Sequence, residues 1–487
     1  MGVRNFYLAP GARSQALAIA AGQLSKSGHV SLTVVLDERA MGFAGLGRAL
    51  GSGTPSVLIT TSGTAVANLH PAILEASHSG IPLIVLTADR PESLRNKGAN
   101  QTTMQPGIFA DAVRISMDIP APTEALSPNP RELAEIAVTH AMGENPGPVH
   151  LNLQFSEPLS SAEPNAAGVY EGIGEQKVPL VQTQISELDI VVDDHTVVVA
   201  GPGAGDSAVE FAQLANLPLF AEPTSGARFG PNAINGYPLK IAGPLGAQIR
   251  KVIVFGKPTL TRAVIGMINK SEVWVQKSAT HGHFDVGSNA LGFADQLRPI
   301  GAGSERWLEA WSAGEVQTDS RTELATLLWE RTQEGEQLLF GASELIRKAD
   351  SSVPPKRISA YANRGLSGID GTISTALGLA QNGKQTRALI GDLTLLHDAG
   401  GLNKSGFDDL DVQVIIGNDH GGAIFRNLEM AKTLDAALLE QLFLTPQSAS
   451  IEHLALAYGW KYFSAQTPEQ LEPLLGEKGF VLIEYLL

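Results

Sequence analysis

Short apolar runs rich in Val, Ile and Leu alternate with longer segments of helical pattern along the first third of the chain. Strands that are buried on both faces of a parallel sheet have such continuous apolar runs, whereas half-exposed strands alternate apolar and polar residues. Turn residues such as Gly, Pro and Asp follow each run. We therefore predict strand–helix units built on NFYLAP (5–10), LTVVLD (32–37), SVLITT (56–61), IPLIVLTADRP (81–91) and PVHLNL (148–153).

The same pattern resumes twice further along the chain. Residues 156–190 are rich in Ser, Pro, Gly and Glu and have weak periodicity, which predicts a linker. A second group of strands follows it, with HTVVVAGPGAG (195–205), KVIVFGKPTL (251–260) and EVWVQKS (272–278), and a third contains RALIGDLTLLHD (387–398), VQVIIGNDHGG (412–422) and FVLIEYLL (480–487). We expect an α/β protein with three domains, at 1–160, 185–315 and 325–487, each a parallel sheet flanked by helices.

Composition narrows the classes of function. The 487 residues carry a net charge of −15 and no block of Lys or Arg, which argues against nucleic acids and anionic membranes as partners. The chain has no cysteine, which excludes disulfides, thiolate metal sites and a thiol nucleophile. No apolar run approaches the roughly 18 to 20 residues that span a bilayer, and Pro10 and Gly11 interrupt the N-terminus before a signal peptide could form. We expect a cytoplasmic protein that acts on small molecules.

One glycine-rich segment invites comparison with dinucleotide-binding loops. Gly201, Gly203 and Gly205 follow an apolar run, and glycines in such a place let a helix N-terminus approach a phosphate. Their spacing is G-x-G-x-G, whereas the usual fingerprint has its third glycine at the position of Asp206. We therefore interpret the segment as an ordinary turn and assign no cofactor to it.

Three charged residues, Asp37, Glu38 and Arg39, separate an apolar run from a segment rich in Gly, Ala and Leu. Asp is a common helix cap, and the helix dipole favours a carboxylate in the first turn. On the local pattern alone, capping is the preferred explanation of both acids. The alternative is that Glu38 performs chemistry at this edge of the sheet.

Polar side chains follow two predicted strands of the third domain. Asp392 ends the first strand, and about one strand–helix unit later Asn418 and Asp419 end the next. Because the carboxyl ends of parallel strands meet at one edge of a sheet, these oxygen ligands can hold one hard cation such as Mg²⁺. Neighbouring glycines let backbone amides approach a diphosphate.

This pair of motifs resembles those of thiamine-diphosphate-dependent enzymes. The resemblance implies a three-domain fold with a pyrimidine-binding domain near the N-terminus and a diphosphate-binding domain near the C-terminus. It also implies a Glu that hydrogen-bonds the cofactor's aminopyrimidine ring, and Glu38 stands in that place as the catalytic and cofactor-binding residue. The further cofactor contacts that it implies are Gly391, Asp392, Gly421, Ile424 and Phe425, and the ligands of Mg²⁺, or alternatively Mn²⁺, are Asp392, Asp419 and Gly421.

Within these enzymes, the first and third domains are similar to the 2-succinyl-5-enolpyruvyl-6-hydroxy-3-cyclohexene-1-carboxylate synthase family of menaquinone biosynthesis. The most specific stretches are residues 60–109, which include GANQ, and residues 361–378, which begin YANRG. The resemblance implies that 2-oxoglutarate is decarboxylated and that the resulting four-carbon unit is added 1,4 to isochorismate. It also implies a homodimer or homotetramer with active sites between subunits.

Both substrates are dicarboxylates, so an acidic protein needs local cations to bind them. The resemblance assigns substrate contacts to Arg13, Asn100, Gln101, Ser343, Arg347, Arg364 and Leu428. We assign no catalytic role to His78, His397 or His420, because lone histidines near a site are more often packing or hydrogen-bonding groups.

The chain departs from the family pattern in three respects. It has Ala12 where relatives commonly have Ser, and Asp419 where they often have Asn. It also lacks the helix that usually precedes the first strand and the usual tail, so we expect the first domain to expose apolar surface. The alternative functions are another thiamine-diphosphate-dependent 2-oxo acid decarboxylase or carboligase, a non-catalytic binding protein that kept the fold, and an oxidoreductase that uses residues 201–205.

Overall fold

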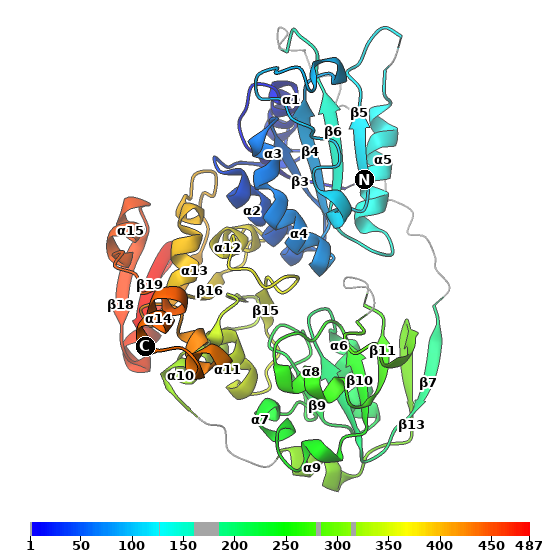
Figure 1. Ribbon diagram of the computed structural model, residues 1–487, viewed down its shortest axis with the longest axis vertical. Helices are drawn as coiled ribbons and strands as arrows, with labels where there is room; N and C mark the ends of the chain where they lie inside the picture. Colours follow the sequence, from blue (N-terminus) through cyan, green and yellow to red (C-terminus); the bar gives the residue numbers. More distant parts are fainter. Residues whose placement is uncertain (1, 126, 160–184, 279–283, 313–317) are drawn as a thin grey trace. The chain divides into compact units, whose positions relative to one another are not determined.

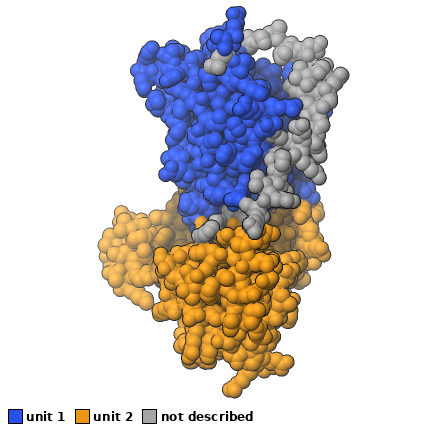
Figure 2. All heavy atoms as spheres, turned by 90° about the vertical axis from the view of Figure 1, so that its right-hand side faces the viewer, with its two compact units in different colours: residues 1–182, 365–383, 400–410 blue, residues 183–364, 384–399, 411–487 orange. Residues whose placement is uncertain are grey.

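The computed structural model describes residues 2–125, 127–159, 185–278, 284–312 and 318–487. The chain divides into two compact units, shown in different colours in Figure 2. Unit 1 contains residues 1–182, 365–383 and 400–410, and unit 2 contains residues 183–364, 384–399 and 411–487. In the part of the chain that the structure describes, no helix has the length and apolar character needed to cross a membrane.

Unit 1 is built on a six-stranded sheet in the order β2-β1-β3-β4-β6-β5, and every neighbouring pair is parallel (Figure 1). Its strands are β1 (Asn5–Leu8), β2 (Ser31–Val34), β3 (Ser56–Thr60), β4 (Leu83–Asp89), β5 (Ser116–Ile119) and β6 (Val149–Gln154). Its helices before residue 160 are α1 (Gln15–Lys26), α2 (Glu38–Ser52), α3 (Thr64–Asn68), α4 (His70–Ser79) and α5 (Pro130–Met142).

Helices cover both faces of this sheet. Consecutive residues of a strand point to opposite faces, so both sets of side chains are buried. On β3, Val57 and Ile59 belong to a core cluster that includes Ala21 of α1 and Val138 of α5. Leu58 lies between them and points to the other face, where a Cβ on Gly45 of α2 would come within 2.4 Å of its side chain. The continuous apolar run of β3 thus follows from burial on both sides.

The glycines of α2 let this helix pack closely against α12 (Thr372–Ala380), which also belongs to unit 1. A Cβ on Gly47 would lie 2.1 Å from the carbonyl oxygen of Thr375. A Cβ on Gly378 would lie 1.9 Å from the carbonyl oxygen of Ala44. Only glycine fits at both points of contact, so the Gly-rich sequence after Glu38 specifies a close helix crossing.

Unit 2 contains two further parallel sheets. The first has the order β12-β11-β10-β8-β9, and a parallel pair, β7 and β13, accompanies it. These strands are β7 (Glu187–Val191), β8 (Thr196–Ala200), β9 (Leu219–Ala221), β10 (Lys251–Phe255), β11 (Glu272–Gln276), β12 (Ala290–Ala294) and β13 (Gln296–Ile300). Its helices are α6 (Asp206–Leu214), α7 (Tyr237–Ile241), α8 (Arg262–Ile268) and α9 (Glu305–Ser312).

The second sheet of unit 2 has the order β15-β14-β16-β17-β19-β18. Its strands are β14 (Gln337–Phe340), β15 (Ser359–Ala362), β16 (Thr386–Gly391), β17 (Val412–Asn418), β18 (Lys461–Ala465) and β19 (Phe480–Leu486). The helices around it are α10 (Ser320–Arg331), α11 (Glu344–Ser352), α13 (Asp392–His397), α14 (Ala436–Leu439), α15 (Ile451–Ala457) and α16 (Pro468–Leu474). Because β16 and β17 are adjacent, their carboxyl ends lie side by side.

These sheets confirm the predicted fold class of parallel sheets flanked by helices. Each of the three large sheets falls within one of the predicted domains, whose boundaries stay a prediction. Most of the predicted linker, at 160–184, lies outside the described residues. The end of that linker prediction was wrong, because Glu187–Val191 form strand β7, which pairs with β13 more than a hundred residues later. A linker and an edge strand of mixed polarity look alike in sequence.

Candidate active site

Glu38 is the first residue of α2, directly after the turn that follows β2. The side chain of Asp37 caps the helix by accepting hydrogen bonds from the backbone N–H groups of Arg39 at 2.8 Å and Ala40 at 3.2 Å. The capping role predicted for Asp37 is therefore confirmed. Because Asp37 satisfies these amides, the half-buried carboxyl group of Glu38 is not required as the cap and can serve another purpose.

Arg13 lies beyond the carboxyl end of β1, at the edge of the same sheet. Its Nη1 donates a hydrogen bond to the carbonyl oxygen of Phe155 at 3.1 Å, and its Nη2 lies 3.2 Å from the exposed carboxylate of Glu157. Its Nε is buried and has no hydrogen-bond partner among the described residues. Arg13 can therefore donate a further hydrogen bond to a ligand anion.

A second arginine, Arg90, lies close to Arg13 and is not among the predicted site residues. Burial, and then the positive charge of Arg13, lower the pKa of Arg90. Arg90 donates hydrogen bonds to Ser62 Oγ at 3.0 Å and to the carbonyl oxygen of Gln101 at 2.7 Å, and Gln101 Nε2 donates to the Ser62 carbonyl oxygen at 2.9 Å. Arg13, Gln101 and Arg90 thus form a cationic group in unit 1, and Asn100 is exposed beside Gln101. The sequence feature that could have indicated Arg90 is its position directly after the apolar strand β4.

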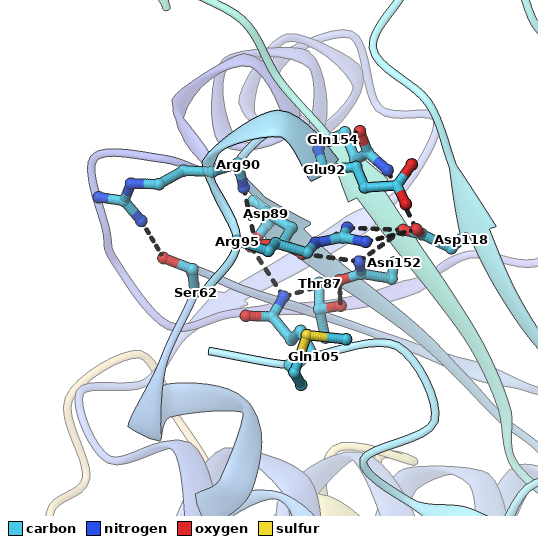
Figure 3. Close-up of polar contacts among 12 residues, drawn as sticks. Ser62, Thr87, Asp89, Arg90, Glu92, Arg95, Gln105, Asp118, Asn152 and Gln154 are labelled. Atoms are coloured by element: carbon cyan, nitrogen blue, oxygen red, sulfur yellow. Dashed lines mark hydrogen bonds and ion pairs between the residues drawn. The ribbon is translucent and has the colours of Figure 1, made fainter. Parts of the chain in front are cut away.

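A buried polar network supports this edge of the sheet (Figure 3). Arg95 donates to the fully buried carboxylate of Asp89 at 2.7 Å and to both carboxylate oxygens of Asp118. Burial would raise the pKa of Asp118, but hydrogen bonds from Arg95, Asn152 and Gln154 outweigh it and hold the pKa below its usual value. Since each buried charge is paired, the network fixes the backbone from which Arg90 projects.

In unit 2, Ser343 caps α11 by accepting a hydrogen bond from the N–H of Leu345 at 3.2 Å. Arg347, one turn later, donates to the carbonyl oxygen of Ser343 at 3.0 Å. Desolvation, followed by the charge of Arg364, lowers the pKa of Arg347. The two predicted substrate arginines of unit 2 are therefore close enough for the charge of one to act on the other.

The predicted metal ligands come together at the ends of β16 and β17. Asp392 begins α13 and is buried, and Asp419 follows β17. Burial and the charge of Asp419 raise the pKa of Asp392 to about 6. The second carboxylate of this pair also contacts Arg321, whose Nη2 lies 2.9 Å from Asp419 Oδ2. The described residues contain no cluster of three or more His, Cys, Asp or Glu that could hold a metal.

A cavity of about 420 Å³ lies beside these ends and is lined by Asp392, Asn418, His420 and Glu484. Among the described residues that line it there is no Lys or Arg. A diphosphate in this cavity would thus need a divalent cation to neutralise its charge. Asp392 is disfavoured as an anion by its burial and by the nearby charge of Asp419, and a cation would relieve both effects, so the residues present fit the predicted group.

The loop after β17 is shaped by its glycines. Gly421 has a φ of 140°, and a Cβ there would lie 2.3 Å from the carbonyl oxygen of Leu444. Ile424 and Phe425 follow in a 3₁₀ helix and are half-buried, as is Leu428 directly after it. Asn427 of that helix donates to Glu344 on α11 at 2.9 Å, which ties this 3₁₀ helix to the helix that carries Arg347.

The predicted site residues therefore form two groups. Unit 1 holds Glu38, Arg13, Asn100 and Gln101, and unit 2 holds Ser343, Arg347, Arg364, Gly391, Asp392, Asp419, Gly421, Ile424, Phe425 and Leu428. Sequence reasoning missed Arg90 and Arg321, because the contacts that bring each to its group join residues far apart in sequence. The absence of a catalytic role for His78, His397 and His420 stays a prediction.

Comparison with known proteins places the chain in a family. Residues 1–111 match the family model of the N-terminal TPP-binding domain of thiamine pyrophosphate enzymes, and residues 347–485 match that of the C-terminal TPP-binding domain. The crystal structure of benzoylformate decarboxylase from Polynucleobacter necessarius covers 100% of this chain and 96% of its own, with a TM-score of 0.71. At 15% sequence identity, this likeness supports the fold alone.

Curated relatives are similar over nearly the whole chain. The 2-succinyl-5-enolpyruvyl-6-hydroxy-3-cyclohexene-1-carboxylate synthase of Leifsonia xyli subsp. xyli is 39% identical over 97% of this chain and 91% of the relative. The synthase of the same name from Clavibacter michiganensis subsp. michiganensis is 41% identical over 97% and 91%, and that from Arthrobacter sp. is 39% identical over 97% and 84%. The chain therefore belongs to the 2-succinyl-5-enolpyruvyl-6-hydroxy-3-cyclohexene-1-carboxylate synthase family of thiamine pyrophosphate enzymes.

Proposed function

We propose that the chain decarboxylates 2-oxoglutarate and adds the resulting four-carbon unit 1,4 to isochorismate, as a cytoplasmic enzyme of menaquinone biosynthesis. The observation that carries the proposal is the similarity to synthases of this name over 97% of the chain. The arginines fit this reaction, because both substrates are dicarboxylates and the chain is strongly acidic.

Thiamine diphosphate, when bound, supplies the reactive carbon that attacks the 2-oxo acid and stabilises the negative charge left by loss of CO₂. Glu38 would hold a proton on the aminopyrimidine ring. Asp392, Asp419 and the backbone of Gly421 would hold Mg²⁺ or Mn²⁺ against the diphosphate, and Gly391 leaves its backbone accessible. Ile424 and Phe425 would exclude water from the reactive carbon of the cofactor.

The substrates would be held by charge-assisted hydrogen bonds. Arg13 and Gln101 in unit 1, with the neighbouring Asn100, offer one set of donors. Arg347, Arg364 and Ser343 in unit 2 offer another, and Leu428 adds an apolar contact. Two separate cationic groups suit two dicarboxylates that enter in turn, whereas a single monocarboxylic acid would leave several guanidinium groups unpaired.

The active form would be a homodimer or homotetramer in which each site takes Glu38 from one subunit and Asp392 from another. Next to Glu38, Leu36 is 76% exposed and Val34 is 43% exposed. Adjacent exposed apolar side chains are typical of surfaces that a partner covers. This observation supports an interface near Glu38.

A product assay tests the proposal. The purified chain, loaded with thiamine diphosphate and Mg²⁺, is given isochorismate with either 2-oxoglutarate or pyruvate, and products are identified by mass spectrometry. We expect an adduct that carries the four-carbon unit of 2-oxoglutarate, and little turnover of pyruvate. A preference for pyruvate, or release of CO₂ from another 2-oxo acid without an isochorismate adduct, would favour the alternative of a general carboligase.

A further inference from the structure

Glu222 is a buried acidic residue to which the proposed function gives no role. It directly follows β9 in the first sheet of unit 2 and is only 2% exposed. Its Oε1 accepts two hydrogen bonds, from the backbone N–H of Thr259 at 2.8 Å and of Leu260 at 2.7 Å. One carboxylate oxygen therefore fixes the loop between β10 and α8.

That loop holds Arg364. The Nη2 of Arg364 donates to the carbonyl oxygen of Thr259 at 3.0 Å and to its Oγ1 at 3.1 Å. Arg364 is 7% exposed, and its Nε is buried without a hydrogen-bond partner among the described residues. Burial of a charged donor is costly unless it finds an acceptor, so the unused Nε is suited to a ligand oxygen.

Glycines seat the same loop against the strand beside it. A Cβ on Gly201 would lie 2.1 Å from the backbone nitrogen of Pro258, and a Cβ on Gly256 would lie 2.4 Å from the carbonyl oxygen of Pro202. Packing of the loop at 256–260 thus accounts for Gly201 of the G-x-G-x-G segment without any cofactor.

The same part of unit 2 anchors the helix that carries Arg347. Asp350 lies on α11 with Arg347, is buried, and accepts a hydrogen bond from the hydroxyl of Tyr237 at 2.5 Å. The guanidinium of Arg228 lies 3.7 Å from the Asp350 carboxyl group. It donates hydrogen bonds to the backbone carbonyl oxygens of Ala221, at the end of β9, and of Asp350. The guanidinium of Arg364 and the helix that carries Arg347 are thus each held by residues that follow β9 or β10.

We propose that Glu222 is a positioning residue for substrate binding, which acts through the backbone of Thr259 to aim the guanidinium of Arg364 at a substrate carboxylate. This inference rests on the proposed function, because it takes Arg364 as a substrate contact. The first sheet of unit 2 would then contribute to substrate specificity, because residues that follow its strands β9 and β10 supply the acceptors that orient an arginine of the substrate site.

The buried environment of Glu222 agrees with this role. Burial and the nearby charge of Asp350 raise the pKa of Glu222 to about 8, whereas the charge of Arg364 acts in the opposite direction. Both loop hydrogen bonds use one oxygen as acceptor, which an amide oxygen can replace. Glu222→Gln is therefore the conservative variant, and Glu222→Ala removes the acceptor.

Steady-state kinetics of the holoenzyme test the inference. In Glu222→Ala we expect KM for at least one dicarboxylate to rise about tenfold, the effect of misplacing one charge-assisted contact. The Kd of thiamine diphosphate should stay within about twofold of wild type, and Glu222→Gln should recover most of the lost kcat/KM. Thr259→Val, which removes Oγ1, should raise the same KM by about threefold, and Thr259→Ser should not. If Glu222→Ala does not fold, the Thr259 pair tests the contact through which Glu222 would act, and an unchanged KM in Thr259→Val would overturn the inference.

A double-mutant cycle separates positioning from a general loss of stability. In an Arg364→Ala background, Glu222→Ala should lower kcat/KM by less than about twofold, because the residue through which it acts is already gone. An equal loss in both backgrounds would overturn the inference. So would an unchanged KM in Glu222→Ala, or a loss that Glu222→Gln does not recover although it folds as stably as wild type.

Failure of the proposed function can be distinguished from failure of the inference about Glu222. If wild type turns over neither substrate, the proposed reaction fails, and calorimetric titration with 2-oxoglutarate then decides the inference. Weaker binding in both Arg364→Ala and Glu222→Ala, with recovery in Glu222→Gln, supports it. Binding that depends on Arg364 but not on Glu222 overturns it, and absence of binding to wild type overturns both proposals.

Discussion

The guanidinium of Arg321, in the first turn of α10, forms an ion pair with Asp419 after β17, with Nη2 and Oδ2 2.9 Å apart. The side chain of Asp419 is 16% exposed and that of Arg321 is 23% exposed. The family resemblance implies a neutral Asn at this position, and the ion pair with Arg321 offsets the extra negative charge of Asp419. Such compensation matters because Asp392 lies close enough for the charge of Asp419 to raise its pKa.

This relationship predicts that Asp419→Asn is harmful only while Arg321 is present. The single variant should bind Mn²⁺ about tenfold more weakly than wild type, because a guanidinium that has lost the charge of Asp419 then lies beside the cation. The double variant Asp419→Asn/Arg321→Ala should recover much of that affinity. Electron paramagnetic resonance of free Mn²⁺ measures both, and a double variant that binds no better than the single one would disprove the compensation.

Anchoring and activation of the cofactor should separate between the two units. Asp392→Ala should weaken Mg²⁺-dependent binding of thiamine diphosphate by at least about tenfold, because it removes a predicted metal ligand. Glu38→Gln should leave that Kd within about threefold, while it slows hydrogen–deuterium exchange at the thiazolium C2. Calorimetry and NMR-detected exchange measure the two effects. Unchanged exchange in Glu38→Gln would remove Glu38 from its proposed role.

The sequence predicted most of the central strands, although not β14, and the strand ends that carry chemistry, and the reason is physical. Strands β3, β4, β16 and β17 are buried on both faces, so their apolar runs are continuous. Since parallel strands end at one edge of a sheet, the sequence alone predicted that Asp392 and Asp419 lie close together. The edge strands β5, β15 and β18 were missed, because their sequences, SMDI, SAYA and KYFSA, mix polar and apolar residues.

Supporting contacts could not be predicted in the same way. Arg321 and Asp419 are 98 residues apart, and Glu222 and Thr259 are 37 apart, so no local period relates them. Arg90 had a usable signal in its position after β4, yet only the structure places it near Arg13. Side chains that orient other side chains depend on tertiary packing, which local propensity does not encode.

Helix packing in unit 1 offers a test of stability. Gly378→Ala would place a Cβ 1.9 Å from the carbonyl oxygen of Ala44, so α12 and α2 would have to separate. We expect a loss of about 1 to 3 kcal/mol in the free energy of unfolding, the usual cost of overpacking. Gly22→Ala on α1 is the matched control, since a Cβ there has no neighbour within 4 Å and should stabilise the chain by about 0.5 to 1 kcal/mol. Urea denaturation measures both, and equal effects would contradict the packing argument.

His150 on β6 is a fully buried histidine that contacts Thr87, a residue labelled in Figure 3. Its Nε2 lies 2.8 Å from Thr87 Oγ1, and that hydroxyl donates its proton to Asn152 Oδ1 at 2.9 Å. The ring must therefore donate at Nε2, and its Nδ1 lies 3.3 Å from Ser116 Oγ, which can supply a proton. This arrangement satisfies a neutral imidazole.

Acidification should thus destabilise the fold through His150. Burial lowers the pKa of His150 to about 4, below the 6.5 of an exposed histidine. The unfolded chain takes up the proton first, so stability present above pH 6.5 is lost as the pH falls towards 4. The loss should be on the order of 3 kcal/mol. Denaturation across this range should show a flatter pH dependence of the free energy of unfolding in His150→Gln than in wild type. His140→Gln, at an exposed position, should match wild type. Equal slopes in all three proteins would contradict the role of His150.

Complementation tests whether Glu38 and Asp392 meet across a subunit interface. Glu38→Gln and Asp392→Ala should each be inactive, but a hybrid dimer would contain one site with both residues intact. After random exchange about half of the dimers are hybrids with one working site of two, so the mixture should recover about a quarter of wild-type activity. Asp392→Ala mixed with Asp419→Ala is the matched control, because both changes lie in unit 2 and every hybrid site keeps one defect. If mass spectrometry verifies exchange and no activity returns, the site lies within one subunit.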